Sequence, residues 1–248
     1  MLYSGLVSVT FRDRSPEDII GLAIQAGLHG IEWSSRDHIG PDDAELARFV
    51  RRIMDEQGLA APSYGTYYRA GSAENQDFEA LTEIAQILGA PVLRVWAGSD
   101  RTADMTEEQR SVVMDDLRRI CAIAAKKGLT VSTEYHPWTL TDTFESACRL
   151  FRELPELRTH WQADEGRAAE NHPAVLQALM PKLTVVHAAW WSGGEQRPFA
   201  EGAEIWKTYI QMLKNAGQDR YVLLEFVRNG EIAQLLDDAA ALNAILAY

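Results

Sequence analysis

The sequence predicts a single (β/α)8 barrel, an eight-stranded parallel barrel with outer helices, over residues 1–248. Eight short strand-like runs alternate with helical patterns along the whole chain, as is typical of repeated βα units around a parallel sheet. No linker rich in Pro, Gly or Ser and no charge run interrupts this series, so we expect one domain. Eight units in 248 residues favour a closed barrel over an open sheet.

The strands are expected where the chain is apolar or β-branched. These runs lie at residues 5–10, 30–33, 59–64, 92–96, 129–134, 158–162, 183–187 and 221–226. Between them, helix signals recur. Ser15 followed by Pro16 begins the first helix and Gly27 ends it, and Thr106 with Gln109 has the spacing of a capping box. The last helix carries a sheet-facing apolar stripe that would close the ring: Ile232, Leu235, Leu236, Ala239 and Leu242.

Composition excludes several classes of protein. With 46% apolar residues and no apolar run long enough for a membrane span, a membrane role is not expected. The first residues lack the pattern of a secretory signal, so we expect a cytoplasmic protein. A net charge of −12 with scattered basic residues disfavours nucleic acid as a partner. Cys121 and Cys148 lie at helical apolar positions and are interpreted as structural thiols.

Candidate metal ligands stand at the ends of the later strands, where barrels carry their chemistry. The fifth run ends in Glu134, the seventh in His187 and the eighth near Glu225, while the sixth ends in Gln162 with Asp164 two residues on. Oxygen ligands with one imidazole suit one divalent ion: Mn²⁺, Mg²⁺, Co²⁺ or Zn²⁺. For a single strand-end glutamate, capping a helix or pairing with an arginine is an equal alternative. An ion would neutralise the charges inside these apolar strands.

This pattern resembles the xylose isomerase-like barrel superfamily over the full chain. The segments GIEWSSRDHI, PSYGTYYRAG, LRVWAGS and EYHPWTLTDT also resemble bacterial proteins described as sugar phosphate isomerases or epimerases. The resemblance implies metal ligands Glu, Asp, His and Glu on strands five to eight, which Glu134, His187 and Glu225 match at three positions. Gln162 stands where the aspartate belongs, whereas Asp164 would require a strand two residues longer, and we favour Gln162.

The superfamily includes sugar isomerases, epimerases, dehydratases and type IV apurinic endonucleases. The chain has only six histidines, too few for the endonuclease site, and His29, His38, His160 and His172 are interpreted as surface or core histidines.

The resemblance therefore implies an isomerase or epimerase that acts on a sugar, keto-sugar or related polyhydroxy carbonyl compound. Glu134 and Glu225 would exchange a proton with the substrate through an enediolate, and His187 would be a ligand only. A dehydratase or lyase, or a non-catalytic sugar-binding barrel with a degenerate metal site, are the alternatives. Superfamily members often form homo-oligomers, but the sequence carries no interface signal.

Substrate contacts are expected from aromatic and charged residues at the barrel rim, because sugars present apolar faces and hydroxyl edges. Glu32 is expected in the pocket wall, and for the aromatic residues packing between loops is an equal alternative. The candidate substrate-binding residues are Trp33, Tyr68, Arg94, Trp96, His136 and Arg197.

Overall fold

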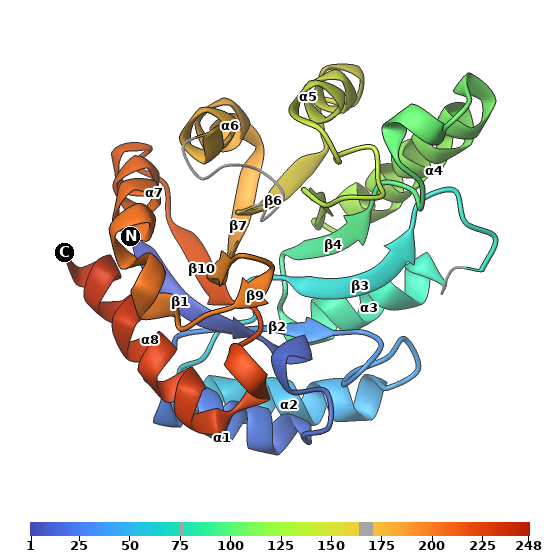
Figure 1. Ribbon diagram of the computed structural model, residues 1–248. Helices are drawn as coiled ribbons and strands as arrows, with labels where there is room; N and C mark the ends of the chain where they lie inside the picture. Colours follow the sequence, from blue (N-terminus) through green and yellow to red (C-terminus); the bar gives the residue numbers. More distant parts are fainter. Residues whose placement is uncertain (75–76, 164–170) are drawn as a thin grey trace.

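The computed structural model describes residues 1–74, 77–163 and 171–248 (Figure 1). Its central sheet is a closed parallel barrel in which the strands neighbour one another in the order β1-β10-β7-β6-β5-β4-β3-β2. The predicted fold class is confirmed. The barrel strands are β1 (Leu2–Val7), β2 (Ile31–Ser34), β3 (Tyr64–Arg69), β4 (Val92–Trp96), β5 (Thr130–Glu134), β6 (Arg158–Gln162), β7 (Leu183–Ala188) and β10 (Arg220–Leu224).

Helices follow the strands and lie around the outside of the barrel (Figure 1). Their buried faces meet the outward-facing strand residues in one large apolar core. No helix of the described part of the chain is long and apolar enough to cross a membrane. The helices are α1 (Pro16–Gln25), α2 (Ala44–Glu56), α3 (Phe78–Leu88), α4 (Glu107–Lys126), α5 (Phe144–Glu153), α6 (His172–Leu179), α7 (Ala203–Asn215) and α8 (Ile232–Ala247).

The helix signals that the sequence carries act as expected. The Ser15 side chain accepts a hydrogen bond from the backbone N–H of Asp18, and Pro16 occupies the first helical position. Thr106 and Gln109 form the reciprocal hydrogen bonds of a capping box at the start of α4. These caps fix where α1 and α4 begin, and hence how long the preceding loops at the barrel mouth are.

The third strand was placed wrongly by the sequence pattern. It runs over Tyr64–Arg69 and not over residues 59–64; before Tyr64 the expected run contributes an isolated bridge, between Ala60 and Gly30. Pro62 lies inside the expected run and has no backbone N–H to donate to a neighbouring strand. The strand therefore starts after Pro62. As a result, Tyr67 and Arg69 belong to the carboxyl-terminal half of β3, the end that faces the barrel mouth.

A small hairpin at the mouth was not predicted. β8 (Trp191–Ser192) pairs antiparallel with β9 (Glu195–Gln196), and the two residues of its turn are Gly193 and Gly194, with φ of 64° and 78°. Two successive positive φ values require glycine-like residues, so this turn depends on the Gly-Gly pair. In Figure 1 the hairpin lies in front of the barrel centre, and Trp191 lines the cavity there.

Candidate metal centre and active site

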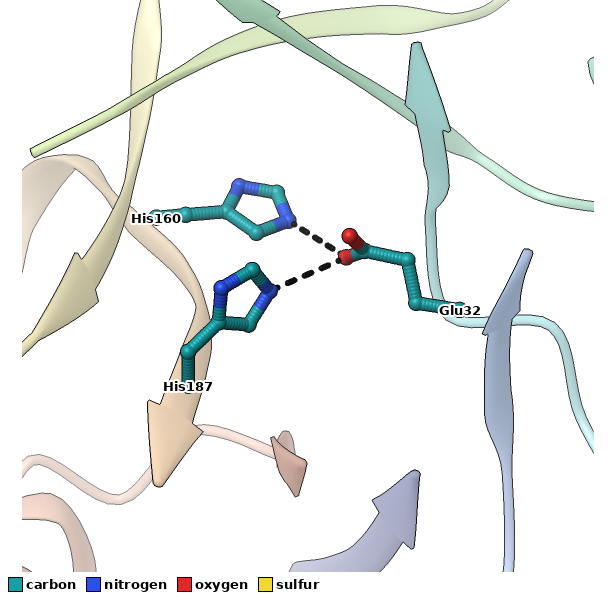
Figure 2. A group of neighbouring side chains, drawn as sticks. All are labelled: Glu32, His160 and His187. Carbon is teal, nitrogen blue, oxygen red and sulfur yellow. Dashed lines mark hydrogen bonds and ion pairs between the residues drawn. The ribbon is translucent and has the colours of Figure 1, made fainter. Parts of the chain in front are cut away.

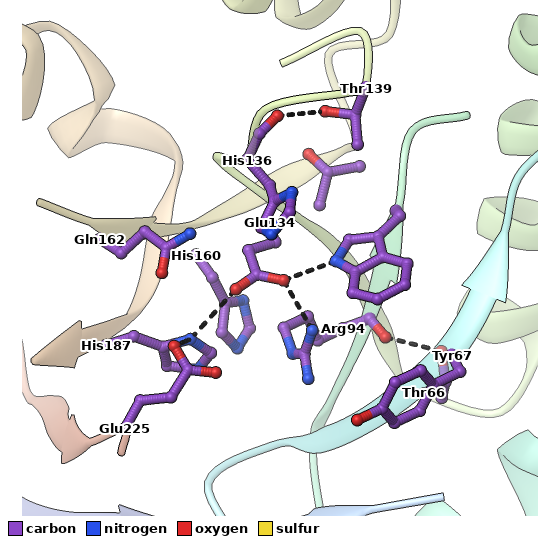
Figure 3. Close-up of polar contacts among 12 residues, drawn as sticks. Thr66, Tyr67, Arg94, Glu134, His136, Thr139, His160, Gln162, His187 and Glu225 are labelled. Carbon is purple, nitrogen blue, oxygen red and sulfur yellow. Dashed lines mark hydrogen bonds and ion pairs between the residues drawn. The ribbon is translucent and has the colours of Figure 1, made fainter. Parts of the chain in front are cut away.

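Three of the predicted ligands converge at the carboxyl ends of β5, β7 and β10. His187 Nδ1 lies 3.2 Å from Glu225 Oε2 and 3.4 Å from Glu134 Oε1. One ligand atom from each residue falls within 4.8 Å of the others, and all three residues are buried. Figure 3 shows these side chains turned toward one common space. The spacing allows one cation to contact all three.

Gln162, at the end of β6, faces the same space. Its Nε2 donates to the Tyr135 carbonyl at 3.3 Å, and Figure 3 shows the side chain beside His187 and Glu134. Gln162 is half-buried and lines the same cavity as His187 and Glu225. The amide oxygen is thus available in the ligand arc, at the position that the sequence favoured. Asp164, the alternative, lies outside the described residues.

The turn after β10 sets the position of Glu225. The backbone N–H of Glu225 donates to the Ala188 carbonyl at 3.0 Å, and the backbone N–H of Phe226 donates to Thr10 Oγ1 at 2.9 Å. Phe226 has a φ of 61°, a conformation that costs an aromatic residue energy. The strained turn is therefore held by hydrogen bonds from β7 and from the loop after β1.

Beneath these ligands, in the interior of the barrel, lies a layer of buried polar groups centred on Glu32 of β2. Glu32 Oε2 is 3.2 Å from Nε2 of both His160 and His187, and Figure 2 shows the two rings pointing at it. Arg94 on β4 joins the two layers, since its Nε donates to Glu32 at 2.8 Å and its Nη1 to Glu134 at 2.7 Å. Ser63 also donates to Glu32.

The charged groups of this cluster shift one another's pKa values. Burial by itself would raise the pKa of Glu32, but His187 and Arg94 outweigh it and hold that pKa well below 4.5. The pKa of Glu134 is likewise lowered, because Arg94 and His187 outweigh burial. Burial lowers the pKa of His187, but Glu225 and Glu32 raise it well above 6.5. The pKa of His160 is lowered, chiefly by burial.

The donor set fits a divalent cation. Three buried carboxylates lie in this cluster, those of Glu32, Glu134 and Glu225, and Arg94 forms ion pairs with two of them, so the carboxylates outnumber the guanidinium that pairs with them. His187 Nδ1 is fully buried yet makes no well-directed hydrogen bond among the described residues. A buried ring nitrogen that makes no well-directed hydrogen bond and lies 3.2 and 3.4 Å from two carboxylate oxygens is suited to binding a cation together with them.

Trp96 and His136, two of the expected substrate-binding residues, lie beside each other, at the end of β4 and just after β5. Trp96 Nε1 donates to Glu134 Oε2 at 2.6 Å, and Arg69 lies 3.8 Å above the indole ring. His136 lines the cavity, which has a volume of about 200 Å³, and its ring is 5.6 Å from that of Trp96. His136 Nδ1 donates to the Pro137 carbonyl at 2.6 Å.

Two expected substrate contacts are wrong, because the side chains face the helices and not the mouth. Trp33 is fully buried and its indole N–H donates to Met54 of α2. Tyr68 is buried, and its hydroxyl donates to Asp116 of α4 at 2.8 Å. Successive strand residues point to opposite faces, so the neighbours of these residues, Glu32 and Tyr67, are the ones that face inward.

Two further expectations change. Arg94 was expected to contact substrate, but it is buried and its guanidinium is engaged by Glu32 and Glu134, so it is part of the frame. Arg197 follows β9, is partly exposed, pairs with Glu201 at 3.0 Å and does not line the cavity beside His187. The structure thus brings together Trp96 and His136 of the expected substrate-binding residues.

The central roles of Glu32 and His160 were missed. His160 was interpreted as an ordinary core or surface histidine, and Glu32 as part of the pocket wall. One signal was present: His160 and Gln162 are two residues apart on one strand and therefore share a face. The partner of His160, Glu32, is 128 residues away in the chain, and no local pattern pairs them.

The comparisons with known proteins identify the family. The model of the xylose isomerase-like TIM barrel matches residues 20–245. The chain belongs to this family. A curated relative, 3-dehydroshikimate dehydratase from Bacillus anthracis, is 26% identical over 163 residues, which is 62% of this chain and 58% of the relative. The match therefore spans less than two thirds of that relative's length.

Solved structures share the fold over nearly the whole chain. A probable 3-DHS dehydratase from Bacillus anthracis, involved in petrobactin synthesis, has a TM-score of 0.81 and 22% identity, with 98% of this chain and 99% of that one covered. The 3-keto-D-glucoside 4-epimerase from E. coli has a TM-score of 0.74 and 18% identity, with both chains fully covered. Two further barrels, with TM-scores of 0.75 and 0.73, were solved with magnesium and with zinc.

Proposed function

We propose that the protein is a divalent-metal-dependent enzyme that transfers a proton at the carbon beside the carbonyl group of a polyhydroxy compound, acting as an isomerase or epimerase. The observation that carries this proposal is the convergence of Glu134, His187 Nδ1 and Glu225 beside an open cavity. Gln162 would complete the ligand set with its amide oxygen. Two structures of the same fold contain magnesium and zinc, which supports a divalent cation in a barrel of this kind.

A divalent ion bound there would supply Lewis-acid polarisation of the substrate carbonyl and would stabilise negative charge on its oxygen. Glu225 lines the cavity and would take the proton from the α-carbon, whose bonding electrons then form the C=C bond of an enediolate. An epimer forms if a second proton donor, on the opposite face, protonates that carbon, and an isomer forms if Glu225 returns its proton to the neighbouring carbon.

The contacts of Glu134 favour a role as a metal ligand over a role as a base. Arg94 and Trp96 both donate to its Oε2, and its pKa is lowered. A carboxylate stabilised in its anionic form is a good ligand and a weak base. We therefore assign Glu225 as the base that acts first and Glu134 chiefly as a ligand, which refines the expectation that both exchange protons.

Dehydration is the second candidate, favoured by the curated relative, which is a dehydratase. If the substrate carries a hydroxyl group on the β-carbon, the same loss of the α-proton can expel it. The C–H electrons form the C=C bond, the C–O bond breaks, and the leaving hydroxide takes a proton to become water. His136 lines the cavity and its Nδ1 donates to the Pro137 carbonyl, so a second hydrogen, on Nε2 of the doubly protonated ring, is the proton that His136 would give to the leaving hydroxide.

The test is proton exchange in D₂O with Mn²⁺ and a panel of ketoses, keto-inositols, hydroxypyruvate and 3-dehydroshikimate, followed by NMR. We expect deuterium at an α-carbon of one compound, and a shift to an epimer, an isomer or a dehydrated product distinguishes the candidates. Glu225→Gln should lower the exchange rate by about 10²- to 10⁴-fold, the usual contribution of a general base. Glu204→Gln, at an exposed carboxylate of α7, is the control.

Removal of the metal with a chelator should abolish exchange, and Mn²⁺ should raise the melting temperature, because a ligand of the native state stabilises it. Exchange that persists in Glu225→Gln would refute the role of that residue. A protein that neither binds Mn²⁺ nor exchanges any compound would instead be a non-catalytic barrel.

A further inference from the structure

We infer that Glu32 is a positioning residue that holds His187 in one tautomer, with the hydrogen on Nε2 and the lone pair of Nδ1 directed at Glu134 and Glu225. Glu32 lies across the barrel from His187 and touches no part of the cavity (Figure 2). The inference rests on the proposed function, because the tautomer matters only if Nδ1 binds a cation.

The chemistry of the contact determines which nitrogen carries the hydrogen. Arg94 Nε donates to Oε1 of Glu32 at 2.8 Å, and Ser63 donates to Oε2. These donors stabilise Glu32 as a carboxylate, which can only accept. The hydrogen bond of 3.2 Å between Glu32 Oε2 and His187 therefore requires a hydrogen on Nε2. When the ring carries this hydrogen alone, as it must in order to bind a cation, the lone pair lies on Nδ1.

The position of Nδ1 agrees with this assignment. It is fully buried, makes no well-directed hydrogen bond among the described residues, and faces Oε2 of Glu225 and Oε1 of Glu134 at 3.2 and 3.4 Å. Histidine ligands of metals commonly donate their other ring N–H to a carboxylate, which sets the ring orientation and increases the basicity of the ligand nitrogen. Glu32 stands where such a carboxylate is needed.

Arg94 makes this arrangement rigid across the barrel. Its guanidinium pairs with Glu32 on one side and with Glu134 on the other. The carboxylate that contacts His187 Nε2 and a carboxylate that faces Nδ1 are therefore held by the same group. Gly65 leaves the room for this contact, because a Cβ there would lie 2.8 Å from both Arg94 Nη2 and Glu32 Oε1.

A second cation between Glu32, His160 and His187 is the competing interpretation, since their ligand atoms also lie within 4.8 Å of one another. Arg94 argues against it. The guanidinium is buried, bonded to Glu32 at 2.8 Å, and its permanent positive charge would repel a cation on the same carboxylate. Such a site would also require both ring nitrogens of His187 to bind metal at once.

The first measurement uses the unaltered full-length protein. Loaded with Zn²⁺ and labelled with ¹⁵N in histidine, it should show His187 with a hydrogen on Nε2 and a metal-bound Nδ1 in its ring ¹⁵N spectrum. A hydrogen on Nδ1 would overturn the inference. This readout needs no variant, so it holds even if replacements at Glu32 prevent folding.

The second measurement compares Mn²⁺ affinity in three proteins by titration calorimetry. Glu32→Gln should bind Mn²⁺ about 10- to 100-fold more weakly, as for lost partners of metal-bound histidines. Ser132→Ala is the matched control: Ser132 is equally buried and bonds His160 Nδ1 at 2.7 Å, but it does not touch His187. Its affinity should equal that of the wild type.

The outcomes separate this inference from the proposed function. One Mn²⁺ per chain with equal affinity in wild type and Glu32→Gln would overturn the role of Glu32 and leave the metal centre standing. Two ions per chain would favour the second cation site and overturn the tautomer assignment. No binding by the wild type would refute the metal centre itself, and the inference with it.

Discussion

At the scale of single residues, the site depends on groups that are individually costly to bury. Glu32, Glu134 and Arg94 are all nearly inaccessible to solvent. A buried charge without a partner costs several kcal/mol, whereas paired and hydrogen-bonded charges can be accommodated. Each oxygen of Glu32 and one of Glu134 is therefore engaged by a nitrogen or hydroxyl donor. The charged groups of the cluster therefore depend on one another, because replacing one of them leaves the buried charge of its partner unpaired.

Gly65 offers a sharp residue-scale test of this packing. Gly65→Ala places a methyl group 2.8 Å from Arg94 Nη2 and Glu32 Oε1, so one of these groups must move. We expect a loss of about 1–3 kcal/mol in the free energy of unfolding, the usual effect of overpacking, together with weaker Mn²⁺ binding. Denaturant unfolding and calorimetry would measure the two effects.

Gly21→Ala is the matched control for that change. Gly21 is exposed inside α1, and a Cβ there meets nothing within 4 Å. It should stabilise the protein by roughly 0.5–1 kcal/mol, because alanine favours a helix, and leave Mn²⁺ binding alone. Equal behaviour of the two variants would contradict the packing account of Gly65.

At the scale of elements, the alternation of strand residues assigns each side chain to the core or the mouth. On β4, Arg94 and Trp96 share the inner face, and on β6 His160 and Gln162 do. On β3 the outward Tyr68 instead joins the barrel to α4, where Asp116 accepts from its hydroxyl and Arg119 donates to it at 2.7 Å. Burial raises the pKa of Tyr68 to about 12, so this hydroxyl stays protonated at neutral pH.

Tyr68→Phe tests the assignment of that residue to the helix side. It removes hydrogen bonds between β3 and α4 and should lower the free energy of unfolding by about 0.5–1.5 kcal/mol. KM for the substrate should not change. Trp96→Phe, which loses the hydrogen bond to Glu134 at the mouth, should instead alter kcat/KM. A raised KM in Tyr68→Phe at unchanged stability would restore Tyr68 as a substrate contact.

At the scale of the whole molecule, closure of the barrel creates the site. β1 pairs with both β2 and β10, which brings the first and last strands together and lets β2 face β7 across the interior. Glu32 and His187 thereby meet from positions 155 residues apart. The core is continuous around the ring, with members from Leu6 to Ile245.

This continuity predicts that residues 1–248 unfold as one domain. Differential scanning calorimetry should show a single transition with equal calorimetric and van't Hoff enthalpies. From about 0.7 kcal/mol per residue near 60 °C, the enthalpy for 248 residues should be on the order of 170 kcal/mol. Two resolved transitions, or a van't Hoff enthalpy well below the calorimetric one, would indicate separate folding units.

The sequence by itself determined the features that are local. The caps at Ser15 and Thr106 and most of the strand runs follow from nearest neighbours along the chain, because they depend on backbone propensity and periodicity. Polar residues at strand ends predicted Glu134, His187 and Glu225, since all parallel barrels gather their strand ends at one mouth. The third strand was predicted in the wrong place, because the apolar run at residues 59–64 was given more weight than Pro62, which interrupts it.

Only the tertiary structure decided what lies across the barrel. Arg94 could bind substrate or pair with carboxylates, and nothing near it in the sequence distinguishes the two; closure of the ring places it between Glu32 and Glu134. The same closure turns Glu32 from a residue of the pocket wall into the partner of His187. These contacts depend on strand tilt and stagger around the whole barrel, which no segment of the chain encodes alone.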